Sequence, residues 1–141
     1  MPPSILIAEH SPSARALLRY VLADEGYDVR HTDTGRAAFN AIVQSPPDIV
    51  LLNVDLPGMD GPDLLRNVKS HEQTRDVSFI VIAPDRHEHK VAVAFELGAT
   101  DFVPKPLSRP AILAGVRNVM RVRSAQTPIR GDCRPAEGSR P

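Results

Sequence analysis

The side chains able to do chemistry in this chain follow short apolar runs. They comprise a carboxylate, an imidazole, a carboxamide and an ammonium: Glu9 and His10 after the run 5–8, Asn53 after the run 49–52, and Lys105 after the run 101–103. A fourth run, 79–83, ends on Ala83, which has only a methyl group. A charged set of this kind can bind and neutralise an opposite charge.

Asn53 is the residue that raises the chemical question. It lies in the stretch DIVLLNVDLPGMDG, where an apolar run changes at once into a loop of Pro, Gly and Asp. The end of a buried strand is a place from which a nucleophile is presented to a ligand. A carboxamide is a poor nucleophile, so the residue types favour binding over covalent chemistry.

Alternating elements are needed to bring these residues together. Short apolar runs predict strands at 5–8, 49–52 and 79–83, a weakly alternating segment predicts one at 27–32, and a further short strand is expected at 101–103. Periodic segments between and after them predict five helices. Strands that alternate with helices form parallel sheets with right-handed crossovers, and runs without polar alternation are typical of strands buried on both faces. We therefore predict an α/β fold with a doubly wound, five-stranded parallel sheet, whose carboxyl-terminal edge carries the site.

Helical spacing also predicts which side chains face the core. In the first helix Ala14, Leu17, Leu18 and Val21 recur at i, i+3, i+4 and i+7. In the helix at 88–97 the same reasoning places Phe95 inward, beside Val91 and Ala94.

Charge and composition suit one domain followed by a tail. Residues 1–120 carry 12 Lys/Arg against 15 Asp/Glu, which argues against nucleic-acid binding by this part. We predict a domain at 1–122 and a disordered basic tail or linker at 123–141, which holds the single cysteine, Cys133. With no apolar run near the roughly 20 residues of a membrane helix, we expect a soluble, cytoplasmic protein without membrane contact.

The order of these motifs resembles the receiver domain of response regulators in two-component signalling. An acid follows the first strand, the acceptor position comes 44 residues later, LPGMDG follows it, and GATDFVPKP comes near the end. The resemblance covers residues 4 to about 122. It implies the flavodoxin-like strand order 2-1-3-4-5, and in this family an aspartate receives a phosphoryl group from a histidine kinase in the presence of Mg²⁺.

The family's functional positions can be assigned one by one. The resemblance places the acidic pair on Glu9 and His10, the phosphoacceptor on Asn53 and a metal-binding backbone carbonyl on Asp55. The remaining positions follow the fourth and fifth strands: the phosphoryl-contacting Thr/Ser falls on Ala83, the phosphoryl-contacting lysine on Lys105 and the switch aromatic on Phe102.

Three of these positions depart from the family's pattern. Asn53 cannot form an acyl phosphate, Ala83 has no hydroxyl, and His10 replaces a hard oxygen ligand. We therefore expect no catalysis, no cofactor and weak or absent Mg²⁺ binding, with Glu9 neutralised by Lys105 and by His10. The sequence is interpreted as a degenerate, pseudo-receiver type that acts in phosphorelay signalling by phosphorylation-independent protein–protein interaction.

Several alternatives stay open. Asn53 is also compatible with a conventional response regulator silenced by an Asp-to-Asn change, and the neutralised pocket with a sensor of small ligands. His10 and Glu9 are two potential ligands of a transition metal. Family analogy places a protein partner or a homodimer contact at 88–97, 101–103 and 108–122, and a purely structural dimerisation domain is a further possibility.

Overall fold

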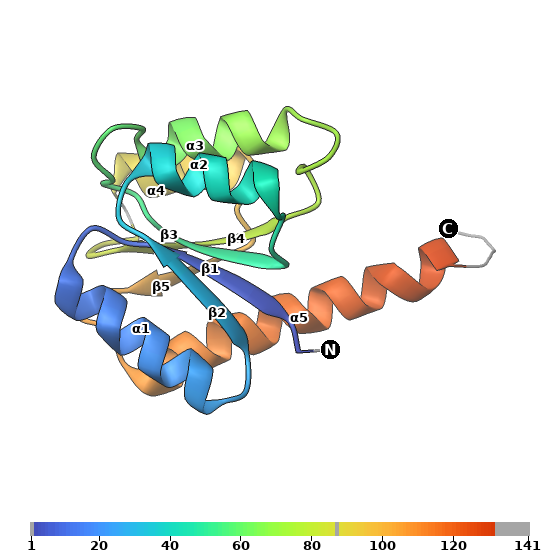
Figure 1. Ribbon diagram of the computed structural model, residues 1–141, viewed down its shortest axis with the longest axis horizontal. Coiled ribbons are helices and arrows are strands. Elements are labelled where there is room, and N and C mark those ends of the chain that lie inside the picture. Colours follow the sequence, from blue (N-terminus) through green and yellow to red (C-terminus); the bar gives the residue numbers. More distant parts are fainter. Residues whose placement is uncertain (1, 87, 132–141) are drawn as a thin grey trace.

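Five parallel strands form one sheet in the order β2-β1-β3-β4-β5 (Figure 1). The computed structural model describes residues 2–86 and 88–131. The strands are β1 (Ser4–Ala8), β2 (Asp28–Thr32), β3 (Ile49–Asn53), β4 (Ser78–Ala83) and β5 (Asp101–Pro104). The helices are α1 (Pro12–Asp24), α2 (Gly35–Gln44), α3 (Gly61–Lys69), α4 (His89–Glu96) and α5 (Arg109–Gly131). The predicted doubly wound α/β fold, with its strand order, is confirmed.

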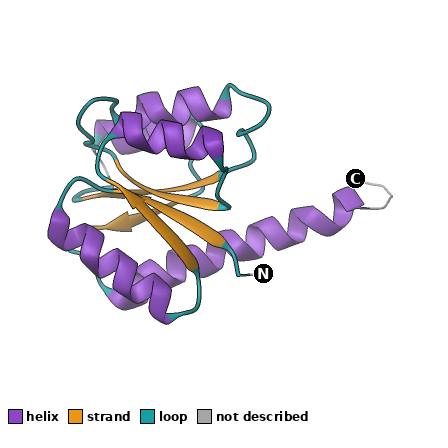
Figure 2. Ribbon diagram, viewed as in Figure 1, coloured by secondary structure: helices purple, strands orange, loops and turns teal. Residues whose placement is uncertain are grey.

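The helices cover both faces of the sheet, as Figure 2 shows. Helices α1 and α5 pack on one face of the sheet, and α2, α3 and α4 pack on the other. Every residue of β3 is buried. That two-sided burial explains why the central strands read as continuous apolar runs in the sequence.

Local signals set the ends of the helices. The Ser11 Oγ caps α1 by accepting a hydrogen bond from the Ala14 N–H at 3.3 Å, and Pro12 occupies the first turn. The Thr34 Oγ1 caps α2 in the same way, with the Ala37 N–H at 3.1 Å. These caps place the start of α1 directly after Glu9 and His10, at the edge of the sheet that carries the site.

Two predicted core residues lie on the surface. Leu17 is 38% exposed and Phe95 is 43% exposed. The buried side of α1 is formed by Leu18, Val21 and Leu22. The sequence pattern was ambiguous because Leu17 and Leu18 are adjacent, and each begins its own i, i+3 or i+4 series.

Helix α5 extends well past the sheet (Figure 1). Arg123 fastens it to the amino-terminal ends of the strands, because its guanidinium donates to the Asp76 carbonyl at 2.9 Å and the Ser78 Oγ at 2.9 Å. The irregular tail predicted from residue 123 differs from the structure up to Gly131, because no proline or glycine interrupts the helix between Gly115 and Pro128. Residues 132–141 lie outside the described part, so the division at 122/123 stays a prediction.

No helix among the described residues is both long enough and apolar enough to cross a membrane.

Candidate functional site

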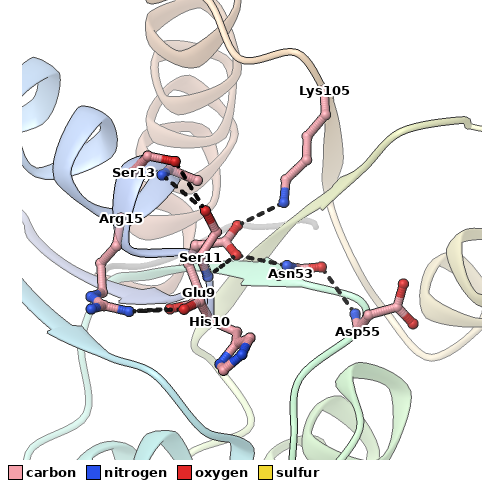
Figure 3. Close-up of polar contacts among 9 residues, drawn as sticks. Glu9, His10, Ser11, Ser13, Arg15, Asn53, Asp55 and Lys105 are labelled. Carbon is pink, nitrogen blue, oxygen red and sulfur yellow. Dashed lines mark hydrogen bonds and ion pairs between the residues drawn. The ribbon is translucent and has the colours of Figure 1, made fainter.

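The carboxyl-terminal ends of β1 and β3 bring two residues 44 positions apart into direct contact. The Asn53 Nδ2 donates to the Glu9 Oε2 at 2.7 Å (Figure 3). The Glu9 side chain is fully buried and Asn53 is 8% exposed. Because β1 and β3 are neighbours with Ala8 opposite Leu52, the next residues along both strands necessarily meet at this edge.

Glu9 has two further partners in this cluster. The Ser11 N–H donates to its Oε2 at 3.0 Å, and the Lys105 Nζ lies 3.2 Å from its Oε1. Within the described part of the chain Oε1 accepts no hydrogen bond of good geometry, so the Lys105 charge is its compensation. An ionised carboxylate is costly to bury unless it is paired, and here an amide, a backbone N–H and an ammonium share that task.

The carboxamide of Asn53 is used at both ends. Its Nδ2 faces the carboxylate of Glu9, and its Oδ1 accepts a hydrogen bond from the Asp55 N–H at 3.0 Å. A carboxylate needs a donor opposite it, so Glu9 fixes which end of the amide faces which way. The side chain therefore ties β1 to the loop that leaves β3.

The Asp55 side chain turns out of this cluster. Its Oδ1 lies 2.6 Å from the Lys90 Nζ, and the Asp60 Oδ1 lies 3.2 Å from the same nitrogen. The hydrogen bonds that Lys90 donates to these two acids raise its pKa. The sequence reasoning missed Lys90. The signal was a lysine in the first turn of a helix, where the macrodipole disfavours a positive charge unless acids lie nearby.

His10 does not join the cluster. Its side chain is exposed, and Figure 3 shows the imidazole turned away from Lys105. Its backbone carbonyl accepts from the Arg15 Nη1 at 3.2 Å, but no described residue bonds to its ring. Successive residues at the end of a strand point in opposite directions, which explains why Glu9 turns in and His10 turns out. The predicted help of His10 in neutralising Glu9 is absent from the described contacts.

Ala83 and Phe102 complete the surroundings without polar contacts of their side chains. Ala83 is buried, and its backbone carbonyl accepts from the Lys105 N–H at 2.9 Å, which places Lys105 at the end of β4. Phe102 is 9% exposed and packs in the core under helix α4. The Arg86 guanidinium lies over its ring, 5.3 Å from the centroid.

Close backbone packing fixes the loops around the site. A Cβ on Gly61 would approach the Val54 Cα to 2.8 Å, so only glycine lets the loop after β3 fold back on the strand. The Lys105–Pro106 peptide bond is cis.

The residues at this edge do not fit a Mg²⁺ ion. Both oxygens of Glu9 already face donors or an ammonium, and Asn53 presents its amide nitrogen to the centre. His10 offers a ring nitrogen where a hard oxygen is preferred, and Asp55 pairs with Lys90. The described residues contain no group of three or more His, Cys, Asp or Glu able to hold a metal ion.

Comparison with known proteins shows which family this chain resembles. A family model described as the response regulator receiver domain matches residues 5–117. The sensory transduction protein RegX3 of Mycolicibacterium smegmatis is 36% identical over 118 residues, which is 84% of this chain and 50% of that protein. The phosphate regulon transcriptional regulatory protein PhoB of Pseudomonas aeruginosa is 30% identical over 118 residues, 84% of this chain and 52% of that protein.

A solved structure agrees with these sequence relatives. The signal receiver domain of a signal transduction histidine kinase from Syntrophus aciditrophicus superposes with a TM-score of 0.75 at 30% identity, covering 88% of this chain and 92% of that one. The chain spans about half the length of the curated relatives it matches.

Proposed function

Because the chain belongs to the receiver-domain family of two-component response regulators, we propose that it is a receiver that signals by protein–protein contact without phosphorylation. The observation that carries the proposal is the double use of Asn53. Its amide donates to the buried Glu9 and accepts from the loop after β3. The residue at the acceptor position therefore holds the site together and is not free to react.

Electrostatics supports the same conclusion. A carboxylate at position 53 would put a second negative charge where the Asn53 nitrogen now lies 2.7 Å from the Glu9 Oε2. Two carboxylates so close repel each other and raise the demand for a cation. With Asn53 in place, Lys105 is the one base among the described residues that pairs with Glu9. The Glu9–Lys105 pair is then neutral without a metal ion, and its charge needs no phosphoryl group or Mg²⁺ to be satisfied.

The contact surface that we assign to the partner comprises α4, β5 and the first half of α5. It exposes Phe95, and Lys90 connects its first helix to the loop after β3. The relative PhoB, about half of which this chain spans, is named a transcriptional regulatory protein, so an output domain or a signalling protein is the class of partner that we propose.

Intact mass spectrometry tests the proposal. The wild-type chain, Asn53→Asp and the triple variant His10→Asp/Asn53→Asp/Ala83→Thr are incubated with Mg²⁺ and a small phosphodonor such as acetyl phosphate. We expect no phosphoryl adduct on the wild-type chain or on Asn53→Asp, and one adduct on the triple variant. The triple variant restores the acceptor, an acidic pair and a hydroxyl together, so it shows that the fold supports the reaction when the residues are present.

Two results would contradict the proposal. A phosphoryl adduct on the wild-type chain would show a working acceptor elsewhere, such as Asp55. Labelling of Asn53→Asp at the rate of the triple variant would favour a conventional response regulator silenced at one position. The intact Lys105 contact to Glu9 is the feature that favours this second candidate.

A further inference from the structure

The outer edge of β2 is open. β2 is a terminal strand of the sheet, so it has a neighbouring strand on one side only (Figure 1). The Asp28 N–H donates to the Pro3 carbonyl at 3.0 Å, which shows that the backbone of Asp28 faces β1. In a parallel ladder the backbone groups of successive residues point to opposite sides of the strand. Val29 and His31 therefore direct their N–H and carbonyl groups outward, where no described residue bonds to them.

The usual protections of an open edge are missing from β2 in the described part of the chain. Residues 28–32 contain no proline. The strand pairs with β1 in unbroken register from Asp28 to Thr32, so no bulge turns the edge away. An open row of backbone donors and acceptors is a template on which a further strand can pair.

Two grooves open beside this edge, on the side of the sheet that α1 covers. One groove of about 370 Å³ is lined by Ala16, Arg19, Tyr20, Ala23 and Val29. The other, of about 190 Å³, is lined by Arg15, His31, Thr32 and Asp33. Val29 and His31 are two residues apart, which places them roughly 6–7 Å from each other along the strand. Two side chains on one face of a strand beside β2 would have the same spacing.

The two grooves differ in chemical character. The groove beside Val29 has an apolar floor with the ring of Tyr20 next to it, so it suits an apolar side chain. The groove beside His31 combines the Arg15 guanidinium, which only donates hydrogen bonds, with the Asp33 carboxylate, which only accepts them. A hydroxyl group can both donate and accept, so it satisfies both of these neighbours.

Charge along the edge favours an acidic occupant. Arg30 lies between Val29 and His31 on β2, and its guanidinium donates to a backbone carbonyl after α2 at 2.7 Å. Within the described part of the chain, neither Arg30 nor the groove-lining Arg15 and Arg19 pairs with an acid. Three arginines thus border the edge, against the two exposed aspartates at positions 28 and 33. An acid directly opposite Arg30 on an added strand would form a cross-strand ion pair.

We propose that the β2 edge binds an extended segment of a partner protein as an additional strand, with an apolar, an acidic and a hydroxyl side chain in succession. The apolar side chain enters the groove beside Val29, the acid lies opposite Arg30, and the hydroxyl enters the groove beside His31. Backbone hydrogen bonds to Val29 and His31 hold the segment, and the side chains select it. This edge is separate from α4, β5 and α5, so the two contacts do not compete.

NMR titration of the ¹⁵N-labelled chain with two synthetic peptides tests the proposal. The peptides are acetyl-STSLETSTS-amide and acetyl-STSTELSTS-amide, which present the three side chains in the two possible chain directions. We expect one of them to shift the amide signals of Val29 and His31 and of residues on α1. Replacement of its glutamate by lysine should weaken binding by about fivefold or more, because like charges would then face each other across the strands.

Variants of the chain separate backbone from side-chain recognition. His31→Pro removes an outward N–H and no bond to β1, so it should keep the fold and lose the peptide. Arg30→Glu should lose the glutamate peptide and bind the lysine peptide, a swap that a loss of folding cannot produce. Arg75→Glu is the control of equal charge change, because Arg75 is exposed in the turn before β4 and should leave both affinities unchanged.

Three results would overturn the proposal. The first is that neither peptide shifts the signals of β2 at millimolar concentration. The second is that His31→Pro, folded by circular dichroism, binds as tightly as the wild-type chain; if this variant does not fold, the charge swap at Arg30 decides. The third is that the β2 signals shift with the concentration of the chain alone, because another copy would then occupy the edge. None of these results depends on phosphorylation at position 53.

Discussion

A single carboxamide organises the polar contacts of the site at the scale of individual residues. Asn53 has nearly the shape of an aspartate, but it brings a donor to Glu9 where an aspartate would bring a second negative charge. Lys105 then has only one carboxylate to neutralise, at 3.2 Å. The burial of Glu9 makes this balance strict, because water cannot replace a lost partner.

Removal of the Lys105 charge therefore has a predicted cost. Lys105→Met should lower the free energy of unfolding by about 1–3 kcal/mol, since it leaves a buried carboxylate short of a partner. In a Glu9→Gln background the same change should cost much less, because no buried charge then remains. Urea unfolding at neutral pH measures the coupling free energy between Lys105 and Glu9. The wild-type chain, both single variants and the double variant are compared.

An exposed ion pair provides the control for this cycle. Arg66 and Asp63 lie 3.0 Å apart on α3, with both side chains more than half exposed. Arg66→Met should change stability by no more than about 1 kcal/mol. Equal costs for Lys105→Met and Arg66→Met would show that Lys105 is an ordinary surface lysine.

Two lysines hold the helices α3 and α4 in place at the scale of elements. The Lys69 Nζ donates to the carbonyls of Arg75 at 2.9 Å and Val77 at 2.6 Å, and lies 5.8 Å from the Phe79 ring centroid. It closes the turn between α3 and β4 from a half-buried position. Lys90 joins α4 to the loop after β3 from an exposed position.

Because Lys69 is half-buried and Lys90 is paired with two acids, the stability that each lysine contributes changes with pH in the opposite direction. Burial is the main cause that lowers the pKa of Lys69 below 10.5, whereas hydrogen bonds to Asp55 and Asp60 raise that of Lys90 above 10.5. The unfolded chain thus holds the Lys69 proton more tightly than the folded chain does. Stability contributed by Lys69 rises as pH increases from its lowered pKa through 10.5. The contribution of Lys90 is complete below 10.5 and is lost as pH rises through its raised pKa.

Chemical unfolding from about pH 8 to about pH 11 measures how the stability contributed by each lysine changes with pH. The stability of the wild-type chain relative to Lys69→Met should increase across this range, and its stability relative to Lys90→Met should decrease. Because each comparison is with a variant of the same chain, the titration of other groups cancels. If the stability relative to Lys69→Met and the stability relative to Lys90→Met changed in the same direction with pH, the pKa shift of one of the two lysines would have been assigned the wrong sign.

The sheet divides the interior into two cores at the scale of the whole molecule. Ile80 faces the core under α1 and α5, and its neighbour Val81 faces the core under α2, α3 and α4. All five strands lie in one sheet, so the loss of packing on either face removes the support of the other. The two cores should therefore behave as one cooperative unit.

Substitutions on the two faces test this cooperativity. Ile80→Ala and Val81→Ala should each lower the free energy of unfolding by about 1–5 kcal/mol, through lost burial and a cavity. Amide NMR signals from α1 and from α3 should disappear in a single transition in both variants. A separate transition for the helices on one face would show that the cores unfold independently.

The sequence predicted those features of the fold and of the site that depend on a local residue pattern or on the order of the strands. Continuous apolar runs identified the strands, and the parallel order brought Glu9, Asn53 and Lys105 to one edge. Lys90 could not be found in this way, because its contact with Asp55 joins residues 35 positions apart, one in the loop after β3 and the other in the first turn of α4. Leu17 was misplaced because helical period alone does not distinguish two neighbouring apolar stripes.

The hydrogen bond between Asn53 and Glu9 also constrains the order in which this sequence can change. An aspartate at position 53 alone would set two carboxylates against the ammonium of Lys105, so this substitution by itself costs stability. The substitution becomes favourable only after another substitution has supplied an acid or a hydroxyl that lets a cation bind. The amide of Asn53 thus makes the effect of any substitution at this position depend on the other residues of the site.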